Sequence, residues 1–232
     1  MDQKRLTLFA GHYGSGKTNI AVNYALHLAK MGKKVCIADL DIVNPYFRTK
    51  DSAPELERAG IKLISPQFAN SNVDLPALPA EAYSVVEDKS AYGIMDIGGD
   101  DRGAYALGRY VPFIKEEDSY RMVFVANCYR PLTRKPEEAL EVMREIEEAC
   151  GLAFTHIINN SNLGTETTPQ TVLDSLPYIE ELSRISGLPL FLHTARWDVA
   201  EKLDIPQVMP MQLQEKYFDL PEQRPQNRPL WG

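Results

Sequence analysis

Eight residues near the amino terminus constrain the fold of this chain more than any other segment. Residues 11–18 read Gly-His-Tyr-Gly-Ser-Gly-Lys-Thr, which is the G-x-x-x-x-G-K-T pattern of a phosphate-binding loop. The apolar run at 6–10 before the loop predicts a strand. After the loop, apolar residues recur at helical spacing until Gly32, where we expect the helix to stop. The motif therefore stands between a strand and a helix, which is the context that a phosphate-binding loop requires.

The loop predicts a site for the phosphates of a nucleotide. Its backbone N–H groups can surround phosphate oxygens, and the helix that follows points its positive end at them. We expect Lys17 to reach the β- and γ-phosphates and to act in catalysis, and the Thr18 hydroxyl to bind Mg²⁺. Glycines let the backbone come close because they carry no Cβ. The expected nucleotide-binding residues of the loop are Gly11, Gly14, Ser15, Gly16, Lys17, Thr18 and Asn19.

The composition is that of one folded domain. The chain has 232 residues, of which 44% are hydrophobic and 25% charged; these values are ordinary for a protein that buries a single core in water. We expect residues 1–205 to form a P-loop nucleotide-binding domain and the proline-rich residues 206–232 to be a tail of the same domain. The net charge of −7 disfavours a non-specific nucleic-acid surface, so no nucleic-acid partner is expected.

Targeting signals and cysteine spacing favour a cytoplasmic protein. No apolar run is long enough to span a bilayer, and the first residues lead directly into the predicted strand without a signal peptide. The three cysteines form no C-x-x-C or C-x-C pair, so a zinc or iron–sulfur site built from neighbouring cysteines is not expected. Cys36 and Cys128 lie in apolar runs, where a buried, unreactive thiol is expected.

The rest of the chain alternates strands and helices. Near-continuous apolar runs separated by helical segments are typical of a largely parallel sheet that is covered on both faces. The sequence therefore predicts an α/β fold with a doubly wound, mostly parallel sheet of about seven strands. The expected strands are at 6–10, 35–38, 61–64, 92–95, 122–126, 156–158 and 188–192, and the later helices are at 79–88, 136–150 and 169–186.

Polar residues stand where several predicted strands end. Asp39 and Asp41 end the second strand, Asp96 ends the fourth, and Asn159 and Asn160 end the sixth. Ligands bind at the carboxyl ends of the strands in such sheets, so we expect these side chains to converge around the phosphates and the base. A carboxylate there can hold Mg²⁺ or orient an attacking water. A single acid in such a place more often caps a helix, but three beside a phosphate-binding loop favour a functional site.

Three segments resemble the MinD/ParA/Mrp class of P-loop ATPases, which includes the nitrogenase iron protein. The loop and the helix after it look like that class, and residues 39–45, Asp-Leu-Asp-Ile-Val-Asn-Pro, resemble its D-x-D segment. Residues 96–100, Asp-Ile-Gly-Gly-Asp, resemble the D-x-x-G-D switch of the nitrogenase iron protein. The resemblance covers about residues 5–200, with its specific motifs in the first hundred. It implies an ATP-driven homodimer that cycles between two shapes.

The resemblance also implies roles for individual residues. By the matching positions, Asp41 would position or activate the attacking water and so be catalytic. Asp39 and Asp96 would serve Mg²⁺ and its water shell. Gly99 would lie near the γ-phosphate, and Asn159 would touch the adenine. ATP and Mg²⁺ are therefore the expected cofactors.

The sequence departs from this class at several places. Most members carry a second lysine after the first glycine of the loop, which reaches the partner subunit's phosphates, but here that residue is His12. Imidazole is shorter than a lysine side chain and mostly neutral at pH 7, so His12 has a weaker part, hydrolysis is slow, or another cation such as Arg48, Arg102 or Arg109 stabilises the transition state. His12 can also be simply a residue that the loop tolerates. Residues 206–232 are too rich in proline for an amphipathic membrane helix, so no membrane partner is expected.

Aromatic and arginine residues near the two switch segments are further candidates. Tyr105, Arg109 and Tyr110 follow the second switch. Such side chains on mobile loops can anchor a protein partner, but ordinary packing beneath the loops would explain them equally well.

Three functions fit the sequence. The first is a Mg²⁺-dependent ATPase that works as a switch on a protein partner, such as an accessory or maturation factor. The second is a small-molecule kinase or ATP-dependent ligase resembling dethiobiotin synthetase, which also lacks the second lysine. The third is a metal-delivery GTPase. Adenine is favoured over guanine because residues 159–162 read Asn-Asn-Ser-Asn, without the acid of the N-K-x-D motif that reads guanine.

Overall fold

One sheet of eight parallel strands organises the molecule. The computed structural model describes residues 4–41, 49–65, 80–99, 101–117 and 119–213. The strands lie in the order β3-β2-β4-β1-β5-β6-β7-β8, and each neighbouring pair is parallel. Their bounds are β1 Leu6–Ala10, β2 Val35–Leu40, β3 Lys62–Ile64, β4 Tyr92–Ile97, β5 Tyr120–Ala126, β6 His156–Asn159, β7 Leu190–Arg196 and β8 Val208–Met211.

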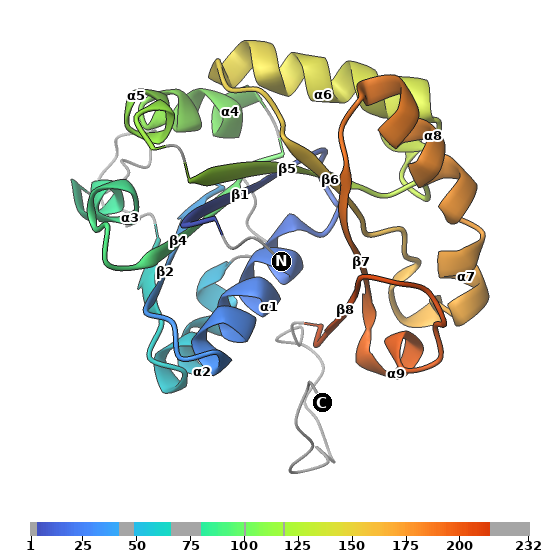
Figure 1. Ribbon diagram of the computed structural model, residues 1–232, viewed down its shortest axis with the longest axis horizontal. Coiled ribbons are helices and arrows are strands. Elements are labelled where there is room, and N and C mark those ends of the chain that lie inside the picture. The colour runs from blue at the N-terminus through green and yellow to red at the C-terminus, as the bar shows by residue number, and fades with distance from the viewer. Residues whose placement is uncertain (1–3, 42–48, 66–79, 100, 118, 214–232) are drawn as a thin grey trace, which may run out of the picture.

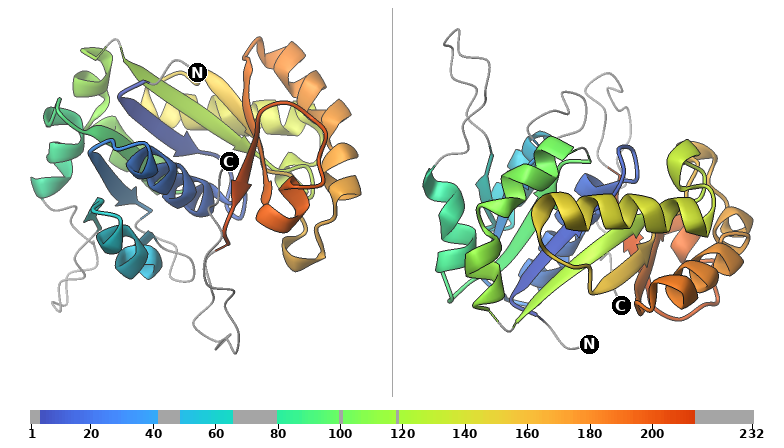
Figure 2. Two further views of the ribbon diagram at one scale, coloured as in Figure 1. Left: turned by 60° about the horizontal axis from the view of Figure 1, so that its bottom comes forward. Right: turned by 90° about the horizontal axis from the view of Figure 1, so that it is seen from above.

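Helices cover both faces of the sheet, as Figures 1 and 2 show. On one face, α1 packs against β1, β2 and β4 and α2 packs against β3, and on the other face lie α3, α4, α5, α6 and α8. The predicted doubly wound α/β fold is confirmed. The α-helices are α1 Lys17–Lys30, α2 Ala53–Arg58, α3 Ser84–Glu87, α4 Asp101–Gly108, α5 Val111–Lys115, α6 Pro136–Cys150, α7 Pro169–Leu173, α8 Leu176–Ser186 and α9 Trp197–Ala200, and the 3₁₀ turns are η1 Thr49–Ser52, η2 Ala80–Tyr83, η3 Pro131–Thr133 and η4 Gly164–Glu166.

Alternation along the strands divides the interior into two main cores. Successive side chains of a strand point to opposite faces of a sheet. In β1, Leu6 and Leu8 enter the core beneath α4–α6, whereas Phe9 enters the core beneath α1. Because both faces are buried, the strands read as continuous apolar runs, which is why their positions are visible in the sequence.

The segment expected to be a tail contributes a strand. β8 pairs in parallel with β7 at the edge of the sheet, so the sheet has eight strands rather than about seven. Just beyond β8, the Asn23 side chain of α1 donates to the Gln212 carbonyl and accepts from the Gln212 N–H, each at 2.9 Å. Because of Pro210, the sequence predicts that this segment belongs to the proline-rich tail. An edge strand tolerates a proline, however, so Pro210 can lie inside β8. The rest of the expected tail, 214–232, lies outside the described residues.

The helix expected at 169–186 is broken into α7 and α8. Pro177, in the first turn of α8, has no N–H to donate to a carbonyl one turn earlier, so a continuous helix would lose that hydrogen bond. The chain instead restarts after Ser175, whose hydroxyl donates to the Val172 carbonyl at 2.6 Å. The helix expected at 79–88 is shorter, since η2 and α3 cover 80–87.

The cysteines do not all lie where the sequence placed them. All three are free, and Cys36 is buried in β2, where burial raises the pKa of its thiol to about 11. Cys128 lies past the end of β5 and is only half-buried, contrary to the expectation of a buried thiol in a strand. The reason is that β5 ends at Ala126, two residues earlier than Cys128.

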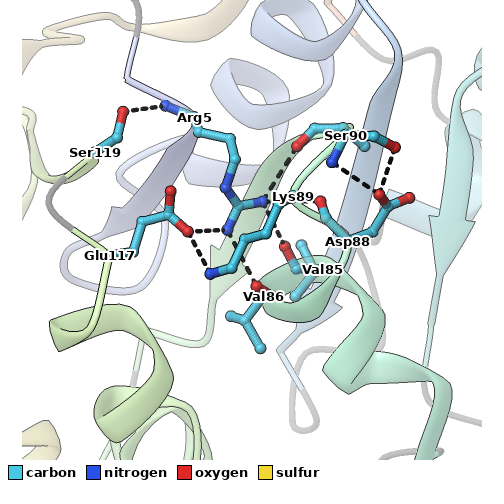
Figure 3. A network of polar contacts seen from close by, with 9 residues as sticks. Arg5, Val85, Val86, Asp88, Lys89, Ser90, Glu117 and Ser119 are labelled. Carbon is cyan, nitrogen blue, oxygen red and sulfur yellow. Dashed lines mark hydrogen bonds and ion pairs between the residues drawn. The ribbon is translucent and has the colours of Figure 1, made fainter.

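The amino-terminal ends of the strands are held by a polar network around Arg5 (Figure 3). The Arg5 guanidinium donates to the Glu117 carboxylate at 2.7 Å, and Lys89 donates to the same oxygen at 2.6 Å. The same guanidinium caps the carboxyl end of α3, where the final carbonyls have no partner in the helix. Its carbonyl acceptors, at 3.2–3.4 Å, belong to Val85, Val86, Asp88 and Ala91.

Glu117→Gln is expected to lower the free energy of unfolding by about 1–2 kcal/mol at pH 7, because the variant loses two charge-assisted hydrogen bonds. The hydrogen bond from Arg5 lowers the pKa of Glu117 to about 2. A carboxyl group with a lowered folded-state pKa stabilises the protein above its unfolded pKa of about 4.3 and loses that effect as the pH falls toward 2. Urea unfolding at pH 7 and pH 3.5 should therefore show the difference between wild type and variant shrinking at the lower pH.

The neighbouring Glu116 provides the control. Its side chain is exposed, so Glu116→Gln should change stability by less than about 0.5 kcal/mol. A stability loss in Glu117→Gln that is the same at both pH values would contradict the proposed ion pair.

Candidate functional site

The phosphate-binding loop joins β1 to α1 in a conformation that its glycines permit. Gly14 and Gly16 have φ values of 75° and 94°, in the left-handed region that other residues rarely adopt. The Ser15 N–H donates to the His12 carbonyl at 3.1 Å, and the Lys17 ammonium donates to the same carbonyl at 3.2 Å. Lys17 is buried although it is charged. The loop therefore places a positive charge and the amino-terminal end of a 14-residue helix side by side.

Three acids lie on the face of the sheet that carries α1. Ile37 and Ile94 enter the core beneath α1, so Asp39 in β2 and Asp96 in β4, two residues further on, face the same side. Asp39 and Asp96 are register partners on adjacent strands, which are about 4.8 Å apart in a sheet. Asp41 follows β2, and its N–H donates to Asp39 Oδ1 at 3.0 Å. All three acids are buried. The structure thus brings together the acids that the sequence singled out.

The carboxyl group of Asp96 is strongly affected by its surroundings. Burial raises its pKa to about 6, and the charge of nearby Asp41 acts in the same direction. The charge of Lys17 and hydrogen bonds from Thr18 and Thr49 oppose this rise. The Thr49 hydroxyl donates to Asp96 Oδ2 at 3.1 Å. Two adjacent buried carboxylates are costly unless a cation compensates them, so this site favours a bound cation.

The chemistry of these groups fits Mg²⁺. This ion takes oxygen ligands, usually one or two carboxylates together with water and substrate phosphates. Thr18, Asp39 and Asp96 offer a hydroxyl and two carboxylates beside the phosphate-binding loop. Within the described residues there is no cluster of three or more His, Cys, Asp or Glu side chains of the kind that holds a metal with protein ligands alone. A magnesium ion shared with a nucleotide does not need such a cluster.

Gly99 lies against the phosphate-binding loop. A Cβ built on Gly99 would stand 2.7 Å from the Tyr13 nitrogen and 2.8 Å from Lys17 Nζ, which is closer than atoms pack. Only glycine therefore allows the segment after β4 to approach the lysine. This agrees with the position expected for Gly99 near the γ-phosphate, although the contact with a nucleotide itself stays a prediction.

The Asn159 side chain is used within the protein. Its amide nitrogen lies 2.9 Å from the Ser175 hydroxyl and 3.2 Å from His193 Nδ1, and its amide oxygen accepts from the Ser161 N–H at 3.2 Å. Asn159 is also almost completely buried. The contact with adenine expected of Asn159 stays a prediction, and the structure gives this residue a role in fixing the loop after β6.

Asn160, rather than Asn159, contacts the phosphate-binding loop. Its amide donates to the Ser15 carbonyl at 2.6 Å and accepts from the Thr194 hydroxyl at 2.7 Å. It is so close to Gly16 that a Cβ there would lie 2.2 Å from the amide nitrogen. Ile158 belongs to the core beneath α1. Asn160, two residues further on, faces the same side, as expected of a strand-end residue near the phosphate-binding loop.

Two more residues contact the site without belonging to a sequence motif. Thr49, which holds Asp96, directly follows residues 42–48, which lie outside the described residues and include the end of the D-x-D segment. Arg130, in the turn after β5, donates from Nε to the Gly14 carbonyl at 2.9 Å. No spacing rule points to either residue, because each approaches the site from a distant part of the chain.

The aromatic and arginine candidates near the switch segments differ in their exposure to solvent. Tyr105 on α4 is 66% exposed, whereas Tyr110 is buried in the core and is therefore ordinary packing. Arg109 is exposed between α4 and α5. The Arg102 side chain and the whole of Arg48 lie outside the described parts of the chain.

Comparison with known proteins supports the fold and gives a coarse class. No family model matches the chain. Cell division protein FtsY from Thermotoga maritima superimposes with a TM-score of 0.56 at 17% identity, over 82% of this chain and 61% of that one. The protein has the P-loop NTPase fold. The signal recognition particle 54 kDa protein from Aeropyrum pernix K1, solved in complex with GDP, gives a TM-score of 0.51 at 17% identity, over 83% of this chain and 41% of that one.

One relative by sequence is the cytosolic Fe-S cluster assembly factor cfd1 of Emericella nidulans. It is 31% identical over 97 residues, which are 41% of this chain and 27% of that protein. The chain thus matches about a quarter of this relative and less than two thirds of the solved chains above. These matches support a P-loop nucleotide-binding protein, and membership of the MinD/ParA/Mrp class stays a prediction. Across the described residues, no helix has the length and apolar character needed to cross a bilayer.

Asp96→Asn is expected to stabilise the protein at pH 7.5 when Mg²⁺ and nucleotide are removed with a chelator. A carboxyl group with a raised folded-state pKa makes the protein lose stability as the pH rises from about 4, its unfolded pKa, through the folded-state value. Asparagine carries no charge to bury. Chemical unfolding should therefore show the advantage of the variant growing between pH 4.5 and pH 7.5.

Asp204→Asn serves as the control, because Asp204 is exposed and its replacement should have little effect at any pH. An Asp96→Asn variant that is less stable than wild type by the same amount at all pH values would contradict the buried charge. Added Mg²⁺ should raise the stability of wild type more than that of Asp96→Asn.

Proposed function

We propose that the protein is a Mg²⁺-dependent ATPase that works as a nucleotide-driven switch on a protein partner. The observation that carries the proposal is the approach of Gly99 to the Lys17 ammonium. Lys17 is expected to hold the γ-phosphate, so the loss of that phosphate would change the contacts of the segment after β4. A segment that changes its position with the state of the nucleotide is what a switch requires.

Each residue of the site has a part in the proposed reaction. The loop amides and Lys17 bind the phosphates, and the positive end of α1 favours their charge. Thr18, Asp39 and Asp96 would hold Mg²⁺, which would neutralise charge on the phosphate oxygens. Asp41 would orient a water toward the γ-phosphate. Asn160 keeps the loop in place by its bond to the Ser15 carbonyl.

Exposed aromatic side chains near the site support a protein partner. Tyr13 in the phosphate-binding loop is 55% exposed, and Tyr105 lies on α4, the helix that follows the Gly99 segment. Large exposed aromatic side chains are typical anchors of protein interfaces. In the proposed cycle, ATP brings two copies of the chain together and hydrolysis separates them. The match to an Fe-S cluster assembly factor supports an accessory role for this switch.

The proposed function is tested by the molar mass of the protein in two nucleotide states. Light scattering after chromatography should give a dimer with Mg²⁺ and a non-hydrolysable ATP analogue, and a monomer with ADP. The corresponding GTP analogue should be less effective at equal concentration. The same monomer mass in both states would contradict the dimeric switch, and ATP turnover that requires a small-molecule acceptor would then favour the kinase-like alternative.

Asp41→Asn is expected to separate binding from hydrolysis. The variant keeps Lys17, Thr18 and the loop amides, so ATP should bind with an affinity close to that of wild type. Its turnover number should fall at least about 100-fold if Asp41 orients the water. With ordinary ATP, the variant should then remain a dimer, as the wild type does with the non-hydrolysable analogue. A variant that hydrolyses ATP at the wild-type rate would remove Asp41 from the mechanism.

Gly99→Ala is expected to impair nucleotide binding, because its Cβ would overlap the Tyr13 backbone and the Lys17 ammonium. We expect the dissociation constant of the ATP analogue to rise at least about tenfold, and the melting temperature to fall because the Tyr13 backbone must shift. Gly108→Ala is the matched control, since a Cβ there would meet only the Cys150 carbonyl at 3.9 Å. Equal nucleotide affinities of the two variants would show that the Gly99 segment does not meet the bound phosphates.

A further inference from the structure

We propose that Arg130 adds a fixed positive charge to the phosphate-binding loop of its own chain, and that this charge increases affinity for nucleotides in proportion to their phosphate charge. This inference rests on the proposed function, since it concerns the same site. Arg130 is a positioning residue, because its contact in the structure is with the phosphate-binding loop. It acts within one chain, from the turn between β5 and η3.

The turn that carries Arg130 is rigid. Asn127, which directly follows β5, is buried, and its side-chain oxygen accepts from the N–H groups of Tyr129 and Asn162 at 3.0 and 3.4 Å. The buried Thr133 hydroxyl donates to the Asn127 carbonyl at 2.8 Å. The Arg130 N–H also donates to the Asn127 carbonyl, at 3.2 Å. The backbone of Arg130 is therefore fixed before any ligand binds, so little entropy is lost when its side chain acts.

The turn is also fastened to neighbouring parts of the site. The Cys128 N–H donates to the Ser161 hydroxyl in the loop after β6, at 3.1 Å. The Tyr129 hydroxyl donates to the Thr171 carbonyl in α7, at 2.7 Å. These bonds tie the turn to the same loop that presents Asn160 to the phosphate-binding loop.

The guanidinium of Arg130 packs directly on the phosphate-binding loop. Its Nε donates to the Gly14 carbonyl at 2.9 Å, and a Cβ built on Gly14 would lie 3.7 Å from that nitrogen. Both polar groups of the peptide unit between Gly14 and Ser15 are therefore hydrogen-bonded. Its carbonyl accepts from Arg130, and its N–H donates to the His12 carbonyl. The positive charge of Arg130 thus lies one peptide unit away from the groups that are expected to bind phosphate.

The charge of Arg130 is not compensated by an acid. In the described parts of the chain, no carboxylate lies within ion-pair distance of this guanidinium, and its hydrogen bond to Gly14 uses Nε alone. The two terminal nitrogens retain donors for an anion. Since a guanidinium stays charged at every physiological pH, Arg130 provides a permanent positive charge beside the loop.

The test compares the affinities of wild type, Arg130→Gln, Arg130→Lys and Arg134→Gln for a non-hydrolysable ATP analogue, ADP and AMP, measured by calorimetry with Mg²⁺. Arg134 lies on the same turn and is exposed, and among the described residues its side chain makes no hydrogen bond or ion pair. We expect Arg130→Gln to weaken the ATP analogue about tenfold and ADP about threefold, with AMP nearly unchanged. Arg130→Lys should restore most of the affinity, and Arg134→Gln should match wild type.

The outcomes separate this inference from the proposed function. An equal loss for all three nucleotides in Arg130→Gln would make Arg130 a structural anchor of the loop and overturn the inference. Identical affinities of Arg130→Gln and Arg134→Gln would overturn it as well, while the proposed function would stand. A wild-type protein that binds none of the nucleotides would overturn both.

Discussion

The nucleotide end of this fold depends on two carboxylates that the sheet buries side by side. Asp39 and Asp96 face each other on β2 and β4 with α1 above them. Charges removed from water are costly unless an opposite charge compensates them. The protein places Lys17 close by, and under the proposed function a cation bound together with the nucleotide would supply the remaining compensation. The two acids would then lower folding stability without the metal and raise affinity for it.

Close backbone approach is the second requirement of the site. Gly99 and Gly16 each lie where a Cβ would overlap another part of the site, the first against Lys17 and the second against Asn160. The backbone at Gly99 and the side chains of Asn160 and Arg130 thus meet around one short loop. In such a packed arrangement, a small displacement of the loop must be passed to its neighbours, because interiors deform little. Under the proposed function, the loss of one phosphate would therefore be transmitted from the loop to the segment after β4.

Sequence reasoning succeeded where physical rules are local. The phosphate-binding loop, the parallel sheet and the strand-end acids follow from glycine spacing, apolar runs and the chain direction of parallel strands. It failed where the decision depends on tertiary contacts. The eighth strand was hidden by Pro210, which an edge strand accepts, and the interruption between α7 and α8 follows from the single residue Pro177. Arg130 and Thr49 meet the site only because the fold brings remote turns together, so neither could be found from spacing alone.

The link between Asn23 and Gln212 couples the last described strand to the phosphate-binding helix. A single amide side chain makes both bonds, so α1 is directly hydrogen-bonded to the residue that follows β8. A truncation before Gln212 would strip α1 of this support, and a truncation before β8 would also remove Met209 and Met211 from the core beneath α1. A spectroscopic probe attached at Leu213, the next residue in the chain, would for the same reason report movements of the helix that carries Lys17, from a point remote in sequence.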